Sequence, residues 1–318
     1  MIVVTGGVGF VGSNLVFKLN AMGVTDILIV EKLSKSSHQD NLLDCQFRDI
    51  IDIDVFLSTM QKRKGYSDGI QTIFHQGANT NTTDLDKKVM FQDNYDASIA
   101  IMNICSEHNI PLIYASSASV YGDGSTFVEN PANEAALNPY AESKIRVDNY
   151  FRSHRNQFKS QVVSLRYFNV YGPREKHKGP MASMVYQLHC QLKQGNTIKL
   201  FEGSGGYESG EQRRDFIYVD DVNRFHEIII SDQRTFGQTY NLGSGKNYSV
   251  NEIFEIIESL MQTGIKPDYA EDLPGEAFQN MSDITKARQL GWSPEIGIKE
   301  GIKRSIDYIK TVVLKNIE

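Results

Sequence analysis

Short apolar runs alternate with longer amphipathic segments along the first half of the chain. Five continuous apolar runs predict strands buried on both faces: Ile2–Thr5, Asp26–Glu31, Gln71–His75, Ile110–Ser116 and Gln161–Phe168. The segments between them predict helices at Phe10–Ala21, Asp52–Lys62, Asn94–His108 and Asn138–Phe158. Strands that alternate with helices form parallel sheets through right-handed connections. The pattern therefore predicts an α/β fold with a doubly wound parallel sheet.

The pattern changes after residue 168. Two stretches, 171–180 and 202–214, are rich in glycine and charge and predict long loops, which often carry function. Phe216–Val219 and Thr239–Leu242 predict strands that rejoin the first sheet. Further along, apolar residues share one helical face, namely Val250, Ile253, Phe254, Ile257, Leu260 and Met261, and a final helix is expected from Lys299 to about Val313.

Composition narrows the class of protein. The 318 residues suit one large α/β unit with an additional lobe, and the net charge of -6 argues against nucleic acid as the main partner. The three cysteines lie far apart without CxxC spacing, which is typical of a reducing compartment and predicts no metal site. The first residues have no basic region, and no apolar run is long enough to span a membrane. We therefore expect a cytoplasmic enzyme.

A glycine-rich turn joins the first strand to the first helix. Gly6, Gly9 and Gly12 have GxxGxxG spacing, Phe10 and Val11 lie between them, and an acid, Glu31, ends the second strand about 20 residues later. Glycines let the backbone approach a pyrophosphate, and the helix N-terminus attracts its charge. Strand, turn, helix and acid together predict a dinucleotide site on a Rossmann sheet. We expect residues 1–168, rejoined by 216–242, to form the dinucleotide-binding domain, and 169–318 to form mainly a smaller substrate-binding lobe.

The second strand carries conflicting signals on the cofactor. Glu31 can accept hydrogen bonds from a ribose, which favours NAD. Lys32 and Lys35 follow at once and can hold a 2′-phosphate, which favours NADP. The residues leave NAD and NADP open, and NADP is our working expectation.

A tyrosine and a lysine begin the long fourth helix. Tyr140 and Lys144 form Y-x-x-x-K, whose spacing places both side chains on one helical face. A nearby ammonium and an oxidised nicotinamide favour the phenolate and lower the pKa of the tyrosine. Tyr140 can then take a hydroxyl proton while hydride leaves for the cofactor. Ser117 ends the preceding strand and can hydrogen-bond the substrate oxygen.

Longer strings carry a family resemblance. TGGVGFVG, ASSASVYG, YAESK and RYFNVYGPR together resemble the extended short-chain dehydrogenase/reductases that act on sugar nucleotides, the NAD-dependent epimerase/dehydratase family. RYFNVYGPREKHKGPMASM, KLFEGS and RRDFIYVDDV are similar to the 6-epimerases of ADP-heptose within it. The resemblance implies inversion of C6 in ADP-D-glycero-D-manno-heptose for the lipopolysaccharide inner core, by transient oxidation and re-reduction. It also implies a homo-oligomer, specifically a pentamer.

The resemblance also supplies residue roles. It makes Lys178 a second acid/base group that also touches the cofactor, and it makes Lys144 the ligand of the nicotinamide ribose. It implies further cofactor contacts at His38, Asp49, Gln76, Gly77, Ala78, Asn79, Thr80, Asp93 and Val170. It implies substrate contacts at Asn169, Gln187, Phe201, Glu202, Gly203, Ser204 and Arg214.

The chain departs from the family pattern in places. The segment GGYESGEQ lengthens the loop before Arg213, so that Arg213 and Arg214 both remain candidates for the diphosphate. Pro180 and Gln187 stand where the family more often has Ser and His. The alternatives are another nucleotide-sugar epimerase, of the 4-epimerase type, or a 4,6-dehydratase. A dehydratase should carry an Asp-Glu pair just after the catalytic serine, where this chain has Ala118 and Ser119.

Overall fold

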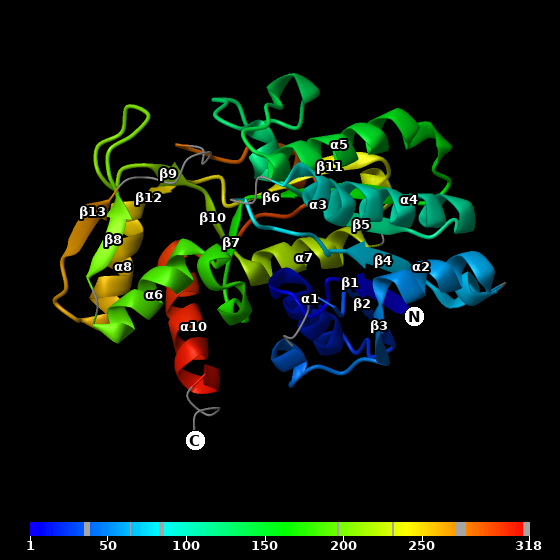
Figure 1. Ribbon diagram of the computed structural model, residues 1–318, viewed down its shortest axis with the longest axis horizontal. Coiled ribbons are helices and arrows are strands. Elements are labelled where there is room, and N and C mark those ends of the chain that lie inside the picture. Colours follow the sequence, from blue (N-terminus) through cyan, green and yellow to red (C-terminus); the bar gives the residue numbers. More distant parts are fainter. Residues whose placement is uncertain are drawn as a thin grey trace. The chain divides into compact units, whose positions relative to one another are not determined.

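A computed structural model describes residues 1–34, 39–63, 65–82, 86–195, 197–230, 232–270 and 278–313. The chain divides into two compact units (Figure 1). Unit 1 comprises Met1–Val120, Asn138–Arg166 and Asn223–Tyr240. Unit 2 comprises Tyr121–Leu137, Tyr167–Val222 and Asn241–Glu318. Unit 2 thus includes four segments that we expected in the first domain, namely 121–137, 167–168, 216–222 and 241–242.

Unit 1 is built on a seven-stranded sheet in the order β11-β6-β5-β4-β1-β2-β3. The strands are β1 Ile2–Thr5, β2 Ile27–Glu31, β3 Asp49–Asp52, β4 Thr72–His75, β5 Leu112–Ser117, β6 Val162–Tyr167 and β11 Gln238–Leu242. The pairs β1·β2, β2·β3, β1·β4 and β4·β5 are parallel, which confirms the predicted doubly wound sheet. The strand order reverses between β1 and β4, and ligands of such sheets bind at the carboxyl ends of the strands at this point.

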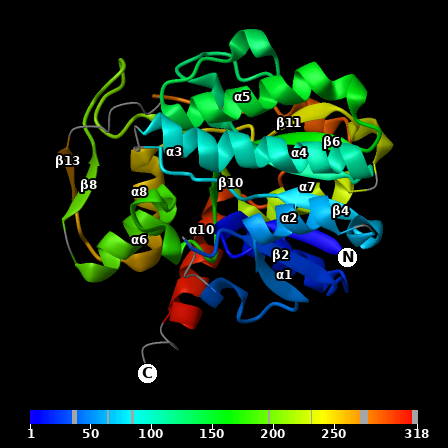
Figure 2. The same ribbon diagram turned by 45° about the vertical axis from the view of Figure 1, so that its right-hand side comes forward.

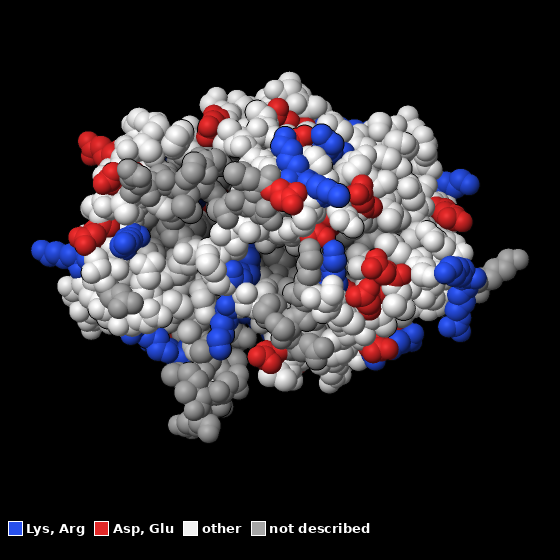
Figure 3. Space-filling view, in the orientation of Figure 1, with Lys and Arg blue, Asp and Glu red and all other residues white. Residues whose placement is uncertain are grey.

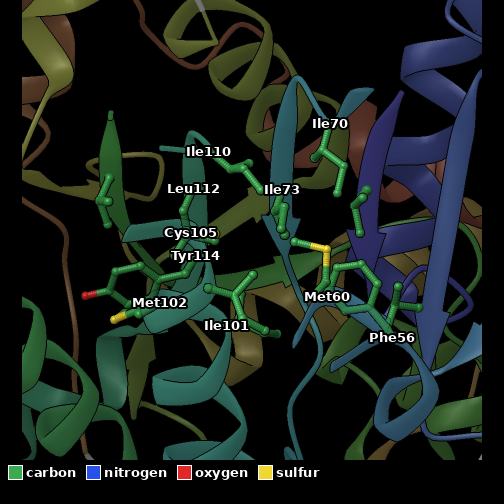
Figure 4. Close-up of a cluster of buried hydrophobic side chains, with 14 of the residues drawn as sticks. Phe56, Met60, Ile70, Ile73, Ile101, Met102, Cys105, Ile110, Leu112 and Tyr114 are labelled. Atoms are coloured by element: carbon green, nitrogen blue, oxygen red, sulfur yellow. The ribbon is translucent and has the colours of Figure 1, made fainter. Parts of the chain in front are cut away.

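Helices cover both faces of this sheet. They are α1 Phe10–Ala21, α2 Ile53–Lys62, α3 Lys87–Phe91, α4 Ala97–His108, α5 Pro139–His154 and most of α7 Val219–Ile229. Side chains of α2, α4 and α5 form one hydrophobic core with alternate strand residues, and Figure 4 shows Phe56, Met60 and Met102 in it. Figures 1 and 2 show α4 and α5 side by side. On the opposite face, Phe74 of β4 meets His226 of α7 edge-on, with ring centroids 5.5 Å apart.

The described residues of unit 2 form three two-stranded sheets. They pair β7 Asn169–Tyr171 with β10 Phe216–Tyr218, β8 Ile198–Phe201 with β13 Pro267–Ala270, and β9 Arg213–Arg214 with β12 Tyr248–Ser249. Its helices are α6 Met184–Gln194, α8 Val250–Met261, α9 Thr285–Arg288 and α10 Ile298–Tyr308, and α6, α8 and α10 share one hydrophobic core. The expectation that 216–219 rejoins the large sheet is wrong, because β11 occupies the place beside β6 and β10 pairs instead with β7.

Short 3₁₀ and π segments connect these elements. The 3₁₀ helices are Gln39–Leu42, Tyr66–Gly69, Ala118–Tyr121, Pro131–Asn133, Arg155–Gln157, Lys176–Met181 and Gln233–Thr235, and the π-helices are Gln92–Asp96 and Ile309–Val313. Across the described ranges, no helix combines the length and apolar character needed to cross a bilayer. Figure 3 shows acidic and basic side chains interspersed on the face in view.

Candidate active site

The glycine-rich turn of unit 1 lies at the point where the strand order reverses. Thr5 of β1 is in register with His75 of β4, so the turns that follow these strands meet. Gly6 has a φ of +65°, and a Cβ there would lie 2.6 Å from the Cα of Gly77. A Cβ on Gly12 would lie 2.1 Å from the carbonyl oxygen of Gly6. Only glycine fits these positions, and the resulting turn at the start of α1 suits a pyrophosphate.

A chain of buried hydrogen bonds joins the two turns. The Thr5 hydroxyl accepts from the Gly77 amide at 3.2 Å, so its own hydrogen is available to Nδ1 of His75 at 2.6 Å. The His75 Nε2–H then donates to Ser98 Oγ at 2.9 Å, and Ser98 donates to the carbonyl of Asn94 at 2.5 Å. Burial lowers the pKa of His75 to about 3, and the charge of Lys144 adds to this effect. The histidine is therefore neutral and holds the expected cofactor loop against β1.

The π-helix Gln92–Asp96 carries a residue that sequence reasoning missed. The side chain of Asn94 accepts from the Asn79 amide at 2.7 Å and donates to the Asn79 carbonyl at 2.9 Å. The same amide nitrogen lies 3.1 Å from Ser143 Oγ, which donates to the Tyr140 carbonyl. Asn94 thus ties the expected cofactor loop to the first turn of α5. The signal for a role of Asn94 is the π-turn itself, which often marks a functional site. This turn is visible in the structure and has no pattern in the sequence.

Acids and a lysine cluster at the end of β2. Burial raises the pKa of Glu31, and backbone hydrogen bonds from Lys32 and Val8 oppose that rise. The bond from Val8 places the carboxylate beside the glycine-rich turn. Lys32 Nζ forms an ion pair with Asp93 at 2.6 Å. Asp52, rather than the expected Asp49, is level with Glu31.

Asp49 lies at the amino end of β3, exposed and in register with Leu28. Three residues of strand separate it from the carboxyl edge, a rise of about 10 Å. The structure therefore does not bring Asp49 to the predicted cofactor edge. Lys35 and His38 lie outside the described residues.

Local capping positions the helix that carries Tyr140 and Lys144. Asn138 caps α5 by accepting from the Ala141 amide at 2.9 Å, and Pro139 takes the first helical position, where its missing N–H costs nothing. Tyr140 therefore sits in the first turn and Lys144 in the second, with the Lys144 Nζ 5.8 Å from the Tyr140 ring centroid. The helix thus presents the predicted pair together.

Ser117 completes this arrangement at the end of β5. Its Oγ accepts from the amide of Ser119 at 3.2 Å and lies 3.0 Å from the Ser119 hydroxyl. A hydrogen bond from Ser117 to the Tyr140 side chain lowers the tyrosine pKa, but burial dominates and raises it. The expected lowering therefore needs a cationic nicotinamide in addition to Lys144. The structure brings together Ser117, Tyr140 and Lys144 as predicted.

Burial also lowers the pKa of Lys144 to about 8, and the charge of Asp148 opposes the fall. The Lys144 ammonium donates to the Ala115 carbonyl at 2.8 Å. Asp148 lies one turn further along α5, fully buried, and accepts from Tyr114 at 2.8 Å and from Arg166 Nη2 at 2.8 Å. This buried carboxylate favours the protonated form of Lys144, a role that the sequence pattern did not reveal.

In unit 2, the loop after β7 holds Lys178. The buried carboxylate of Glu175 accepts from the amides of Gly172 at 2.9 Å and Ser183 at 2.6 Å, which closes the loop. Burial lowers the pKa of Lys178, and Glu175 opposes the shift. The amide of Gln187 donates to loop carbonyls, including that of Pro180 at 2.9 Å. A lysine with a lowered pKa suits proton transfer.

The backbone of this loop is strained at one position. Arg174 is buried and has a φ of +71°, a conformation that costs a residue with a Cβ about 1–2 kcal/mol. Strain of this kind gathers at functional sites, where the surrounding structure holds it in place. This strain favours a functional role for the loop that carries Lys178.

The two neighbouring arginines differ in their surroundings. Arg213 Nη2 contacts Glu252 at 2.9 Å and the Asn247 carbonyl at 3.1 Å. Arg214 is buried, and strand alternation directs it to the opposite face of β9. Arg213 therefore serves the fold of unit 2, and Arg214 remains the stronger candidate for a ligand.

Other expected substrate residues lie near these strands. Asn169 donates to the Asp215 carbonyl at 2.9 Å. Val170, an expected cofactor contact, pairs with Ile217 in the same strand pair. Phe201 ends β8, and the Ser204 hydroxyl accepts from Gln212 at 3.0 Å. The inserted loop folds back on this segment through further backbone bonds, such as Gly210 to Phe201 at 2.8 Å and Tyr207 to Ser204 at 3.0 Å. Within the described ranges, no group of three or more His, Cys, Asp or Glu side chains is placed to hold a metal.

Comparison with known proteins shows the family of the chain. The profile of the NAD dependent epimerase/dehydratase family matches residues 2–243. The chain is 44% identical over 314 residues to ADP-L-glycero-D-manno-heptose-6-epimerase of Alkalilimnicola ehrlichii, with 97% of each chain covered. It is similar to the structure of Helicobacter pylori ADP-L-glycero-D-manno-heptose-6-epimerase, with 32% identity, a TM-score of 0.84, and 98% of this chain and 96% of that one covered. It is also similar to Thermotoga maritima UDP-glucose 4-epimerase with UDP-glucose, with 25% identity, a TM-score of 0.85, and 100% and 99% covered. The chain therefore belongs to the NAD dependent epimerase/dehydratase family.

Proposed function

We propose that this chain inverts C6 of the heptose in ADP-D-glycero-D-manno-heptose to give ADP-L-glycero-D-manno-heptose. The observation that carries the proposal is the 44% identity, over 97% of both chains, to an enzyme of that name. The product would supply the inner core of lipopolysaccharide. The proposed setting is the cytoplasm, where reducing conditions suit the three cysteines. We further propose a homo-oligomer, a pentamer by family resemblance.

The residues of unit 1 suit a nicotinamide dinucleotide. The turn from Gly6 to Gly12 would hold the pyrophosphate, Glu31 and Lys32 the adenosine ribose, and Lys144 the nicotinamide ribose. A bound nicotinamide supplies the reversible hydride exchange that an epimerisation without net redox change requires. We propose NADP as the cofactor, with NAD as the alternative.

Two acid/base groups suit an inversion. Tyr140 would take the proton of the C6 hydroxyl in one stereoisomer, with Ser117 holding the same oxygen. Lys178 would serve the other stereoisomer, and its lowered pKa favours proton exchange near neutral pH. The transient ketone must present both faces in turn, so one base for each face meets the chemical need.

Arg214 is our proposed ligand of the ADP diphosphate, because a guanidinium can bind phosphate oxygens in a bidentate manner. The contacts of Arg213 with Glu252 and Asn247 support this choice between the two arginines. Phe201 to Ser204 would line the nucleotide end of the sugar.

A 4-epimerase of another nucleotide sugar is the second candidate. The similarity to the Thermotoga UDP-glucose 4-epimerase, at a TM-score of 0.85, favours it, because the fold is shared equally with both enzymes. Sequence identity favours the heptose substrate, at 44% against 25%.

The test is to incubate the protein with ADP-D-glycero-D-manno-heptose and to follow C6 by NMR, with UDP-glucose in parallel. Tyr140→Phe and Lys178→Met should each slow inversion at C6 by about 10²–10⁴-fold. The matched control for the tyrosine is Tyr150→Phe, which removes a hydroxyl of the same helix that donates to Asn103. The matched control for the lysine is Lys176→Met, an exposed residue of the same 3₁₀ segment. Inversion at C4 of UDP-glucose without change at C6 of the heptose would replace the first proposal with the second.

A further inference from the structure

An ion pair stands beside the end of β2. Lys32 directly follows Glu31, and its Nζ lies 2.6 Å from Oδ1 of Asp93. The Asp93 side chain is 7% exposed and that of Lys32 is 40% exposed. The carboxylate is therefore buried, and the ammonium reaches it from the surface.

Asp93 is held in place by its surroundings. It belongs to the π-helix Gln92–Asp96, and its Oδ2 lies 3.5 Å from Nδ2 of Asn79. The Asn79 backbone is in turn fixed by both polar atoms of the Asn94 side chain. A carboxylate fixed in this way determines where the flexible Lys32 side chain rests, since the lysine stem is the more mobile partner.

The position of the pair matters for the cofactor. In a Rossmann sheet, the acid at the end of the second strand meets the adenosine ribose, and a neighbouring cation meets the 2′-phosphate of NADP. A phosphate carries about -1.5 to -2 charges at neutral pH. While Lys32 is paired with Asp93, the pair has no net charge and its attraction for a phosphate is small. The lysine attracts a 2′-phosphate fully only after it leaves the carboxylate.

We propose that Asp93 sets the selectivity between NAD and NADP by holding Lys32, so that the lysine serves a 2′-phosphate only when it leaves the carboxylate. This inference rests on the nicotinamide cofactor of the proposed function and is independent of the sugar. Asp93 acts through Lys32 and is a specificity-determining residue for the cofactor.

The test measures the binding of NAD and of NADP to the full-length apoprotein by titration calorimetry. Asp93→Asn keeps the shape of the side chain and removes its charge. The ratio of the Kd for NAD to the Kd for NADP should rise about five- to tenfold, which is the size expected of one charge at a half-exposed site. In a Lys32→Met background, Asp93→Asn should leave the ratio unchanged, because the effect passes through the lysine.

Asp96→Asn is the matched control, since it removes the same charge from an exposed position in the same π-helix. It should change the ratio by less than about twofold. If Asp93→Asn weakens both cofactors equally, Asp93 merely supports the fold and the proposal fails. The proposal also fails if the gain persists without Lys32 or if Asp96→Asn reproduces it.

The binding assay needs no sugar nucleotide. A shifted ratio in a protein without heptose epimerase activity would overturn only the proposed function. An active epimerase with an unchanged ratio would overturn only the role of Asp93.

Discussion

Asp148→Asn tests how far α5, which carries Tyr140 and Lys144, depends on one buried charge. The Arg166 guanidinium donates to Asp148 Oδ2 from Nη2 at 2.8 Å and from Nε at 3.1 Å. Both side chains are 1% exposed. Hydroxyls of Tyr114 and Ser116 also donate to the carboxylate, at 2.8 and 3.1 Å. Asparagine keeps the shape but loses the charge, and it places an N–H₂ group where these donors already point.

The magnitude follows from burial. Removing one partner of a buried ion pair leaves the other charge uncompensated, at a cost of about 3–5 kcal/mol. A domain has about 5–15 kcal/mol of stability in total, so the variant should fold marginally. Adding Arg166→Met should recover part of the loss, because the stranded cation is then gone. Urea unfolding of the wild type, both single variants and the double variant measures each difference.

A second readout separates catalysis from stability. Burial lowers the Lys144 pKa and the charge of Asp148 raises it, and together they place it at about 8. Without that charge, the Lys144 pKa falls, because the protonated ammonium loses its favourable neighbour. The limb of the kcat/KM pH profile that reports Lys144 should move to lower pH in the folded fraction.

The matched control is Asp232→Asn, which breaks an ion pair with Arg234 whose side chain is 63% exposed. It should cost no more than about 1 kcal/mol. If Asp148→Asn costs as little as this control and leaves the pH profile in place, the buried charge neither stabilises the fold around α5 nor raises the pKa of Lys144.

Three further outcomes follow from single sites. Gly12→Ala should weaken dinucleotide binding at least about tenfold in calorimetry, because its Cβ would lie 2.1 Å from the Gly6 carbonyl oxygen and the turn must move. The His189 ring is buried, with no hydrogen-bond partner among the described residues, and burial lowers its pKa to about 4. The unfolded chain binds a proton at His189 from about pH 6.5 downward, so the free energy of unfolding falls as the pH is lowered from about 6.5 to 4. His189→Met should remove that fall. In urea unfolding at pH 7 it should also stabilise the protein by about 1 kcal/mol. Arg214→Gln should raise KM for the ADP-sugar about tenfold or more in steady-state assays, whereas Arg213→Gln should mainly lower the unfolding temperature.

Local patterns in the sequence predicted the frame of the molecule. The helix predicted at Phe10–Ala21 is α1 residue for residue, because the glycine-rich turn marks where it begins. β3 was missed because its four residues, Asp49 to Asp52, begin and end with an acid, and acids are uncommon in strands. Asp49 was expected at the cofactor, and the missed strand places it at the amino end of β3, away from the carboxyl edge of the sheet.

Long-range pairing was beyond prediction. Whether 216–218 joins the large sheet depends on which edge remains available, and β11 takes that edge. Residues such as His75 and Asn94 occur in ordinary strand and helix strings, and nothing local separates them from core residues. Their partners lie up to 70 residues away, as with Thr5 and His75.

The buried polar residues nevertheless obey a rule that connects fold and site. A buried donor or acceptor must find a partner, so each one restricts how its neighbouring elements can sit. Thr5, His75 and Ser98 satisfy one another only if the ends of β1, β4 and the start of α4 meet in a single arrangement. That arrangement is the one that brings Gly6 against Gly77. Apolar contacts alone would allow these elements to shift against one another, whereas the hydrogen bonds would be broken by such a shift. The geometry of the cofactor turn therefore depends on polar residues that belong to no motif.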